Sequence, residues 1–124
     1  MIDGLLSMSL TIYHNPRCRK SREAIQFLEE KGVSLNIVKY LDQTFDVNSL
    51  GEVLKKIDMK PSEIVRKNEI LWKKEYDGNN LSEDQILKLL VKQPILIERP
   101  IVTLGNKGVL ARPIESLIEF LNQG

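Results

Sequence analysis

The feature that most constrains this chain is the close succession of a strand pattern, a polar turn, a helix pattern and a second strand pattern near its start. Apolar and polar residues alternate in residues 9–13, which predicts a strand. Apolar residues in the segment 24–28 then have helical spacing, up to a stop at Lys31-Gly32. A second strand is expected at residues 35–40. These short spacings predict a βαβ unit with parallel strands and a right-handed crossover.

The middle of the chain has helical patterns, and the last part returns to strands. Three helices are expected: one over residues 47–57, a short one opened by Pro61, and one that begins after Ser82 and ends before Pro94. Strands at residues 101–104 and 109–111 then flank the turn Gly105-Asn106-Lys107-Gly108, and Pro113 opens a final helix. The order β-α-β, helices, β-β-α predicts an α/β, thioredoxin-like fold with a mixed sheet and a helical insertion at about residues 45–94.

Length and charge limit the classes of protein to consider. The 124 residues suffice for one hydrophobic core, so we expect a single domain, with residues 1–7 as a disordered extension and either Met1 or Met8 as the natural start. No apolar run approaches the roughly 20 residues of a membrane span, and the first residues lack a secretory signal pattern. The formal net charge of +1 gives no global reason to expect nucleic-acid or membrane binding.

Cys18, the single cysteine, lies where the first strand gives way to the first helix. Unpaired backbone N–H groups and the positive end of the helix dipole favour a thiolate there, and the same N–H groups can hold an oxyanion. Four cations lie within four positions of it and are expected to add to this effect: Arg17, Arg19, Lys20 and Arg22. We therefore expect Cys18 to be an activated nucleophile rather than a small buried hydrophobic residue.

A lone cysteine excludes an internal disulfide and suits a reducing compartment, so we expect a cytoplasmic protein. Ser21 stands where a dithiol oxidoreductase carries its second cysteine, so an outside thiol such as glutathione must resolve an oxidised Cys18. His14, the only histidine, either tunes the thiolate or satisfies backbone groups of the turn, and both interpretations stay open. The sequence contains no Cys/His cluster for a metal, and no bound cofactor is expected.

Four segments carry a further pattern in a fixed order. They are residues 13–22 (YHNPRCRKSR), Arg66-Lys67-Asn68, residues 94–102 (PILIERPIV) and Ala111-Arg112-Pro113. Together they resemble the glutaredoxin-coupled arsenate reductase family over nearly all of residues 8–122. The resemblance implies a thioredoxin-like fold with a helical insertion, which agrees with the periodicity.

The resemblance also implies roles for individual residues. It makes Cys18 and His14 catalytic, and it makes Arg66, Arg99 and Arg112 the ligands of an oxyanion, with a cis peptide bond before Pro100. Guanidinium forks suit a tetrahedral oxyanion because they stay charged and bind in bidentate fashion. Arg99 also stands out by itself, because it lies within an apolar run. The chain departs from the family pattern at Arg19 and Lys20, where small residues usually follow the cysteine.

The implied reaction is the reduction of arsenate to arsenite. The Cys18 thiolate attacks arsenic, glutathione reacts with the adduct, and glutaredoxin resolves the mixed disulfide. Two alternatives are a glutathione-dependent thiol reductase with another substrate, and a regulator of the related Spx-like type that binds RNA polymerase. Ser21 argues against the regulator, because redox-sensing members of that group carry a Cys-x-x-Cys motif.

Overall fold

The computed structural model describes residues 9–122, so the expected extension at residues 1–7 lies outside the described residues. The elements, in chain order, are β1 (Ser9–His14), α2 (Arg19–Glu30), β2 (Ser34–Lys39), α3 (Val47–Ile57), the 3-10 turn η1 (Pro61–Ile64), α4 (Ile70–Glu75), α5 (Glu83–Lys92), the 3-10 turn η2 (Pro94–Leu96), β3 (Ile101–Leu104), β4 (Lys107–Leu110) and α6 (Ile114–Asn122).

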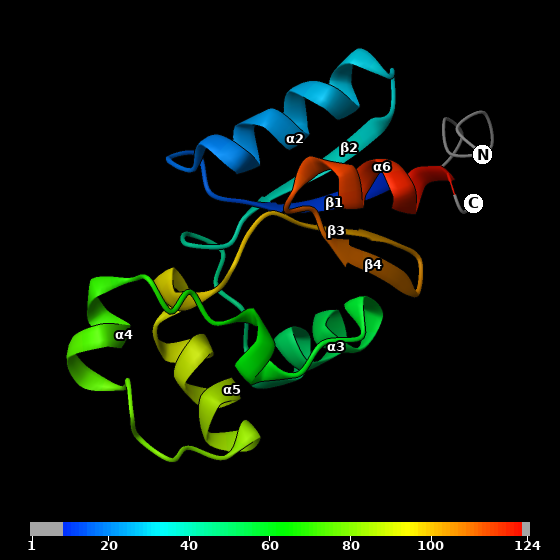
Figure 1. Cartoon of the computed structure of the whole chain (residues 1–124). Coiled ribbons are helices and arrows are strands. Elements are labelled where there is room, and N and C mark those ends of the chain that lie inside the picture. The colour runs from blue at the N-terminus through cyan, green and yellow to red at the C-terminus, as the bar shows by residue number, and fades with distance from the viewer. Residues whose placement is uncertain (1–8, 123–124) are drawn as a thin grey trace.

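The four strands form one mixed sheet in the order β2-β1-β3-β4. β1 is parallel to β2, whereas the β1–β3 and β3–β4 pairs are antiparallel. The chain leaves the sheet after β2, forms α3, α4 and α5, and returns at β3 (Figure 1). The predicted thioredoxin-like arrangement with a helical insertion is therefore confirmed.

Helices cover both faces of the sheet, with α2 and α6 on one side and α3 on the other (Figure 1). The alternation in β1 explains this layering. Leu10 and Ile12 are fully buried in the cluster that α2 and α6 complete, whereas Tyr13 packs against the cluster formed by the insertion. Each face of the central strand thus has its own apolar core.

The insertion is fixed by helix caps and by one short stretch of backbone pairing. The Asp46 side chain caps α3, and Ser82 caps α5 as the sequence predicts. The Arg66 N–H donates to the Leu96 carbonyl at 2.7 Å, and the Glu98 N–H donates to the Ile64 carbonyl at 2.7 Å. This pairing holds the chain after η1 against the segment that enters β3.

Three details differ from the sequence predictions. The hairpin turn has only the two residues Gly105 and Asn106, because the β4 strand already begins at Lys107; Gly105 has a φ of 61°, at the position where a type II′ turn needs glycine. The short helix α4 was not expected, since Glu69 provides no side-chain cap and the helix has only six residues. Pro113 lies just before α6 rather than inside it.

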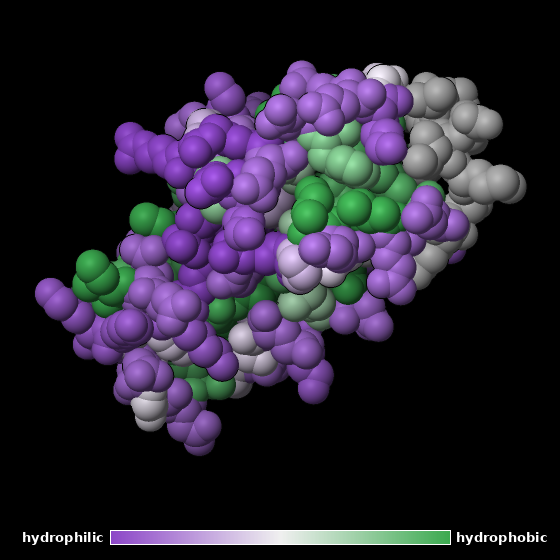
Figure 2. All heavy atoms as spheres, turned by 45° about the horizontal axis from the view of Figure 1, so that its top comes forward, coloured by the Kyte–Doolittle hydropathy of each residue, from purple (hydrophilic) through white to green (hydrophobic). Residues whose placement is uncertain are grey.

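The face seen in Figure 2 is largely hydrophilic, with a broad apolar area on the right of the view and smaller apolar areas on the left. Within residues 9–122, no helix combines the length and apolar character needed to cross a membrane.

Candidate active site

The loop after β1 places Cys18 at the start of a helix. Cys18 is the N-cap residue of α2, and its N–H donates to the Asn15 carbonyl at 2.9 Å. The Asn15 side-chain oxygen accepts from the Arg17 N–H at 3.0 Å, while the Asn15 N–H donates to the Ser21 hydroxyl at 3.4 Å. Ser21 is fully buried, so the residue that replaces a second cysteine ties this loop to the first turn of α2.

Hydrogen bonds and one distant cation favour the thiolate of Cys18. Burial raises the pKa of the Cys18 thiol, but the backbone N–H groups of Ser21 and Lys20 and the guanidinium of Arg99 outweigh it, and the pKa lies below its ordinary value. Arg99 favours the thiolate through its positive charge and through the N–H donors of its side chain.

The cations next to Cys18 in the sequence are exposed. None of their side chains is among the groups that move the Cys18 pKa most. Arg19 is 84% exposed and pairs with Glu23 at 3.4 Å, and Arg22 donates to the Pro16 carbonyl at 2.9 Å. Water screens such exposed charges, so the added effect of these sequence neighbours on the Cys18 pKa stays a prediction.

Arg99 lies near Cys18 because β3 pairs with β1. Ile101 lies opposite Tyr13, so the segment just before β3 runs beside the loop that carries Cys18. The Arg99–Pro100 peptide bond is cis, as predicted, and the Arg112–Pro113 bond is cis as well. The Arg99 side chain is only 6% exposed, and its Nε and Nη1 atoms are buried without a hydrogen-bond partner among the described residues.

The other two arginines each have a carboxylate partner. Arg66 donates from Nη1 to Glu69 Oε2 at 2.9 Å, and both side chains are 23% exposed. Arg112 lies with Nε 3.4 Å from Glu98 Oε2, and its Nη1 donates to the Arg99 carbonyl at 3.4 Å. Arg112 is thus joined directly to the Arg99 segment, and the backbone pairing described above brings Arg66 to the same segment.

His14 lies at the end of β1, on the face of the sheet covered by α2. Its side chain is buried, and its Nδ1 atom has no hydrogen-bond partner among the described residues. Burial, followed by the charges of Lys39 and Arg22, lowers the pKa of His14, so the imidazole is neutral at pH 7. His14 is not among the groups that move the Cys18 pKa most, and its catalytic role stays a prediction.

Tyr40 is a member of this cluster that the sequence analysis missed. It is 1% exposed, and the charges of Arg99, Arg66, Cys18 and Glu98 all act on the pKa of its hydroxyl. One sequence signal was available. Tyr40 ends the second predicted strand, which is parallel to the first, and neighbouring parallel strands end at the same edge of a sheet.

A hollow of about 310 Å³ opens beside the loop that precedes Cys18. It is lined by Asn15, Pro16, Arg17, Lys39, Leu41 and Asp42. Within residues 9–122 there is no group of three or more His, Cys, Asp or Glu side chains arranged to hold a metal ion. The chemistry available is that of a partly exposed thiolate beside guanidinium groups, which suits attack on a bound oxyanion.

Comparison with known proteins agrees with this arrangement. The chain matches the ArsC family over residues 13–120. It is 39% identical to an arsenate reductase of Haemophilus influenzae over 92% of this chain and 100% of that protein, and 37% identical to one of Neisseria meningitidis serogroup A over 87% and 94%. The solved structure of an arsenate reductase from Vibrio cholerae superposes with a TM-score of 0.85 at 35% identity, covering 90% of this chain and 97% of that one. The protein therefore belongs to the ArsC family.

Proposed function

We propose that this protein reduces arsenate to arsenite, with Cys18 as the nucleophile. The observation that carries the proposal is the position of Cys18 at the start of α2, where nearby backbone N–H groups and the buried guanidinium of Arg99 lower the pKa of its thiol. Family membership and the names of its relatives agree with this substrate. The reaction needs a thiol kept reduced, which is consistent with the cytoplasm.

The first step is binding of the oxyanion beside the sulfur. Arg99 offers two unpaired donors, while Arg66 and Arg112 exchange part of their contact with Glu69 and Glu98 for contact with the anion. The positive charge of these guanidinium groups also stabilises the negative charge that develops on the arsenate oxygens during attack. Arg66, Arg99 and Arg112 are thus the substrate-binding residues of this proposal.

In the second step the Cys18 thiolate forms a sulfur–arsenic bond. One arsenic–oxygen bond breaks, and its oxygen leaves as hydroxide, which takes up a proton to become water. Arsenic stays at the +5 level, so no electron has yet been transferred. His14, buried and neutral at the end of β1, is proposed to keep the loop geometry and the thiolate poised for this attack.

Reduction then requires thiols from outside the chain. The sulfur of glutathione attacks the sulfur of Cys18, a disulfide forms, and the electron pair of the sulfur–arsenic bond reduces arsenic to the +3 level, which leaves as arsenite. Glutaredoxin reduces the mixed disulfide and restores Cys18, since Ser21 offers no second thiol. The hollow beside the Cys18 loop, with Arg17 and Lys39 on its wall, gives the carboxylates of glutathione a cationic surface.

The test is arsenate-dependent consumption of NADPH with glutathione, glutaredoxin and glutathione reductase present. Cys18→Ser should reduce the rate to that of the mixture without protein, whereas Arg19→Ala should retain activity because Arg19 points into solvent. Absence of turnover by the wild-type protein contradicts the proposed reaction. Consumption of NADPH with a glutathionylated substrate instead of arsenate would reassign the enzyme to thiol reduction.

A further inference from the structure

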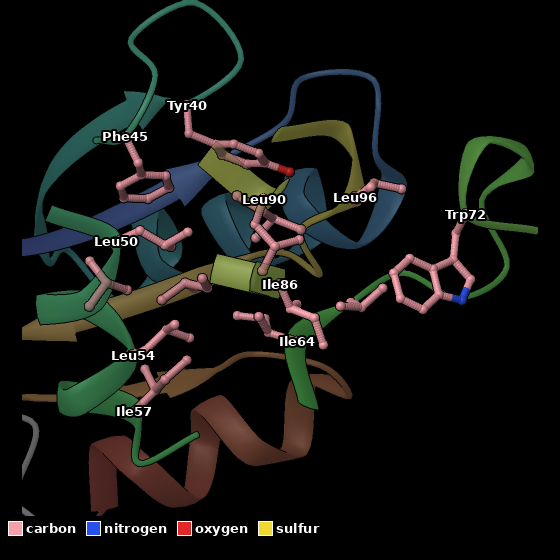
Figure 3. Packing of buried hydrophobic residues seen from close by; sticks show 14 residues of the cluster. Tyr40, Phe45, Leu50, Leu54, Ile57, Ile64, Trp72, Ile86, Leu90 and Leu96 are labelled. Atoms are coloured by element: carbon pink, nitrogen blue, oxygen red, sulfur yellow. The ribbon is translucent and has the colours of Figure 1, made fainter. Parts of the chain in front are cut away.

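The Tyr40 hydroxyl is a buried donor that residues 9–122 leave without a hydrogen-bond partner. Tyr40 directly follows β2, and its ring packs on Phe45 with centroids 6.2 Å apart. Figure 3 shows the hydroxyl oxygen at the end of the ring away from Phe45. This oxygen has no hydrogen-bond partner among the described residues. Buried hydroxyl groups are nearly always hydrogen-bonded, so this one calls for a partner from outside the chain.

Strand pairing places Tyr40 on the side of the core near the proposed oxyanion site. β2 runs parallel to β1 with Lys39 opposite His14, so Tyr40 emerges beside the loop that carries Cys18. The charges of Arg99, Arg66 and Cys18 all act on the Tyr40 hydroxyl. The Nε and Nη1 atoms of Arg99, whose charge acts on this hydroxyl, are likewise buried without a hydrogen-bond partner among the described residues.

The chemistry of this group points to an anion with several acceptor oxygens. Burial raises the pKa of Tyr40 to about 12, so the phenol keeps its proton at neutral pH and can donate a hydrogen bond. Arginine has donors but no acceptor, and the protonated Tyr40 hydroxyl can add a further donor to a ligand at this position. A tetrahedral oxyanion meets that requirement, because separate oxygens can accept from the two side chains at once.

We propose that Tyr40 is an additional oxyanion-binding residue, whose hydroxyl donates to an oxygen of the tetrahedral anion that Arg99 holds beside Cys18. This inference rests on the proposed function and adds a neutral donor to its three arginines. Because Tyr40 carries no charge, it contributes to the orientation of the anion more than to its long-range attraction.

The test compares Tyr40→Phe with the wild-type protein in the protection of Cys18 by anions. The rate of alkylation by iodoacetamide is measured against increasing arsenate, phosphate or sulfate. A hydrogen bond to a charged group is typically strong enough that its loss weakens binding roughly tenfold, so Tyr40→Phe should need about ten times more arsenate for half-protection. Tyr76→Phe is the matched control, because the Tyr76 ring packs against Trp72 in the insertion, with ring centroids 5.9 Å apart, and this variant should leave protection unchanged.

Stability measurements separate ligand binding from a structural role. Since the Tyr40 hydroxyl has no partner among the described residues, Tyr40→Phe should unfold in urea at the same or a higher midpoint than the wild type. A lower midpoint, equal half-protection in both proteins, or no anion protection of the wild type would each overturn the inference. Failure of the proposed function appears differently: the wild type then shows anion protection that Tyr40→Phe weakens, but no arsenate turnover.

Discussion

At the scale of single residues, the Cys18 sulfur lies between backbone donors from its own helix and the Arg99 side chain from the far end of the chain. The helix contribution is local and accompanies any residue at an N-cap position. The Arg99 contribution depends on the low exposure of that guanidinium, because a buried charge is poorly screened by water. Reactivity at Cys18 is thus a property of two segments and not of one motif.

The first prediction concerns the pH dependence of Cys18 alkylation. The wild-type rate should rise with pH through a midpoint below that of an ordinary cysteine thiol, because the thiolate is the reactive form and the pKa of the Cys18 thiol is lowered. Arg99→Met removes the buried positive charge and should move the midpoint upward. Iodoacetamide kinetics from pH 5 to pH 10 measure both.

Arg19→Ala serves as the control in that experiment, since this side chain is exposed and paired with Glu23. Its alkylation midpoint should equal that of the wild type. Equal alkylation midpoints for Arg99→Met and Arg19→Ala would contradict the conclusion that Arg99 lowers the pKa of Cys18.

At the scale of elements, the insertion presents side chains to the site while its helices are held by local caps. In α3, the Asp46 carboxylate accepts from the Ser49 N–H at 2.7 Å, and the Ser49 hydroxyl accepts from the Asp46 N–H at 2.9 Å. Backbone N–H groups at a helix start have no partner within the helix, and here side-chain oxygens accept from two such donors. This reciprocal pair fixes where α3 begins, just after Phe45 enters the core.

The second prediction tests this cap. Asp46→Ala should lower the free energy of unfolding by about 1 kcal/mol, because one N-terminal N–H of α3 loses its acceptor. Asp46→Asn keeps a side-chain oxygen and should cost much less. Urea denaturation followed by circular dichroism measures both, and equal losses in the two variants would show that the hydrogen bond is unimportant.

At the scale of the whole molecule, the helices pack closely against the sheet. Gly108 in β4 is the clearest case. A Cβ atom there would lie 2.9 Å from Ile57 Cγ2 of α3 and 2.9 Å from the Val102 carbonyl oxygen. The absence of a side chain at this position therefore allows α3 to pack on the sheet.

The third prediction follows from that close approach. Gly108→Ala should lower the free energy of unfolding by about 1–3 kcal/mol, because backbone and core atoms must shift. Gly51→Ala provides the opposite case, since nothing lies within 4 Å of its Cβ position in α3, and should raise stability by about 0.5–1 kcal/mol. Chemical denaturation of both proteins is the measurement, and a neutral Gly108→Ala would contradict the packing described.

The sequence by itself determined the elements and the position of the nucleophile, because these depend on residues near one another in the chain. Alternation predicted β1, helical spacing predicted α3, spacing with the Ser82 cap predicted α5, and the change from strand to helix placed Cys18 at a helix start. Local signals were weaker at α4, which lacks a side-chain cap. They were also weaker at the β3–β4 turn, because the segment 105–108 is compatible with either a two-residue or a four-residue turn. The three arginines were identified through resemblance and not through spacing.

Only the tertiary structure decided which charged and polar groups surround Cys18. The pairing of β1 with β2 and β3 brings Tyr40 and Arg99 to the Cys18 loop, and the Val65–Ile97 bridge brings Arg66 to the Arg99 segment. Burial then determines which of these charges is strong, because Arg99 is enclosed by protein while the cations adjacent to Cys18 lie in water. Separation along the chain does not predict which groups lie beside Cys18 or how strongly their charges act on it. Strand register determines the first, and solvent exposure determines the second.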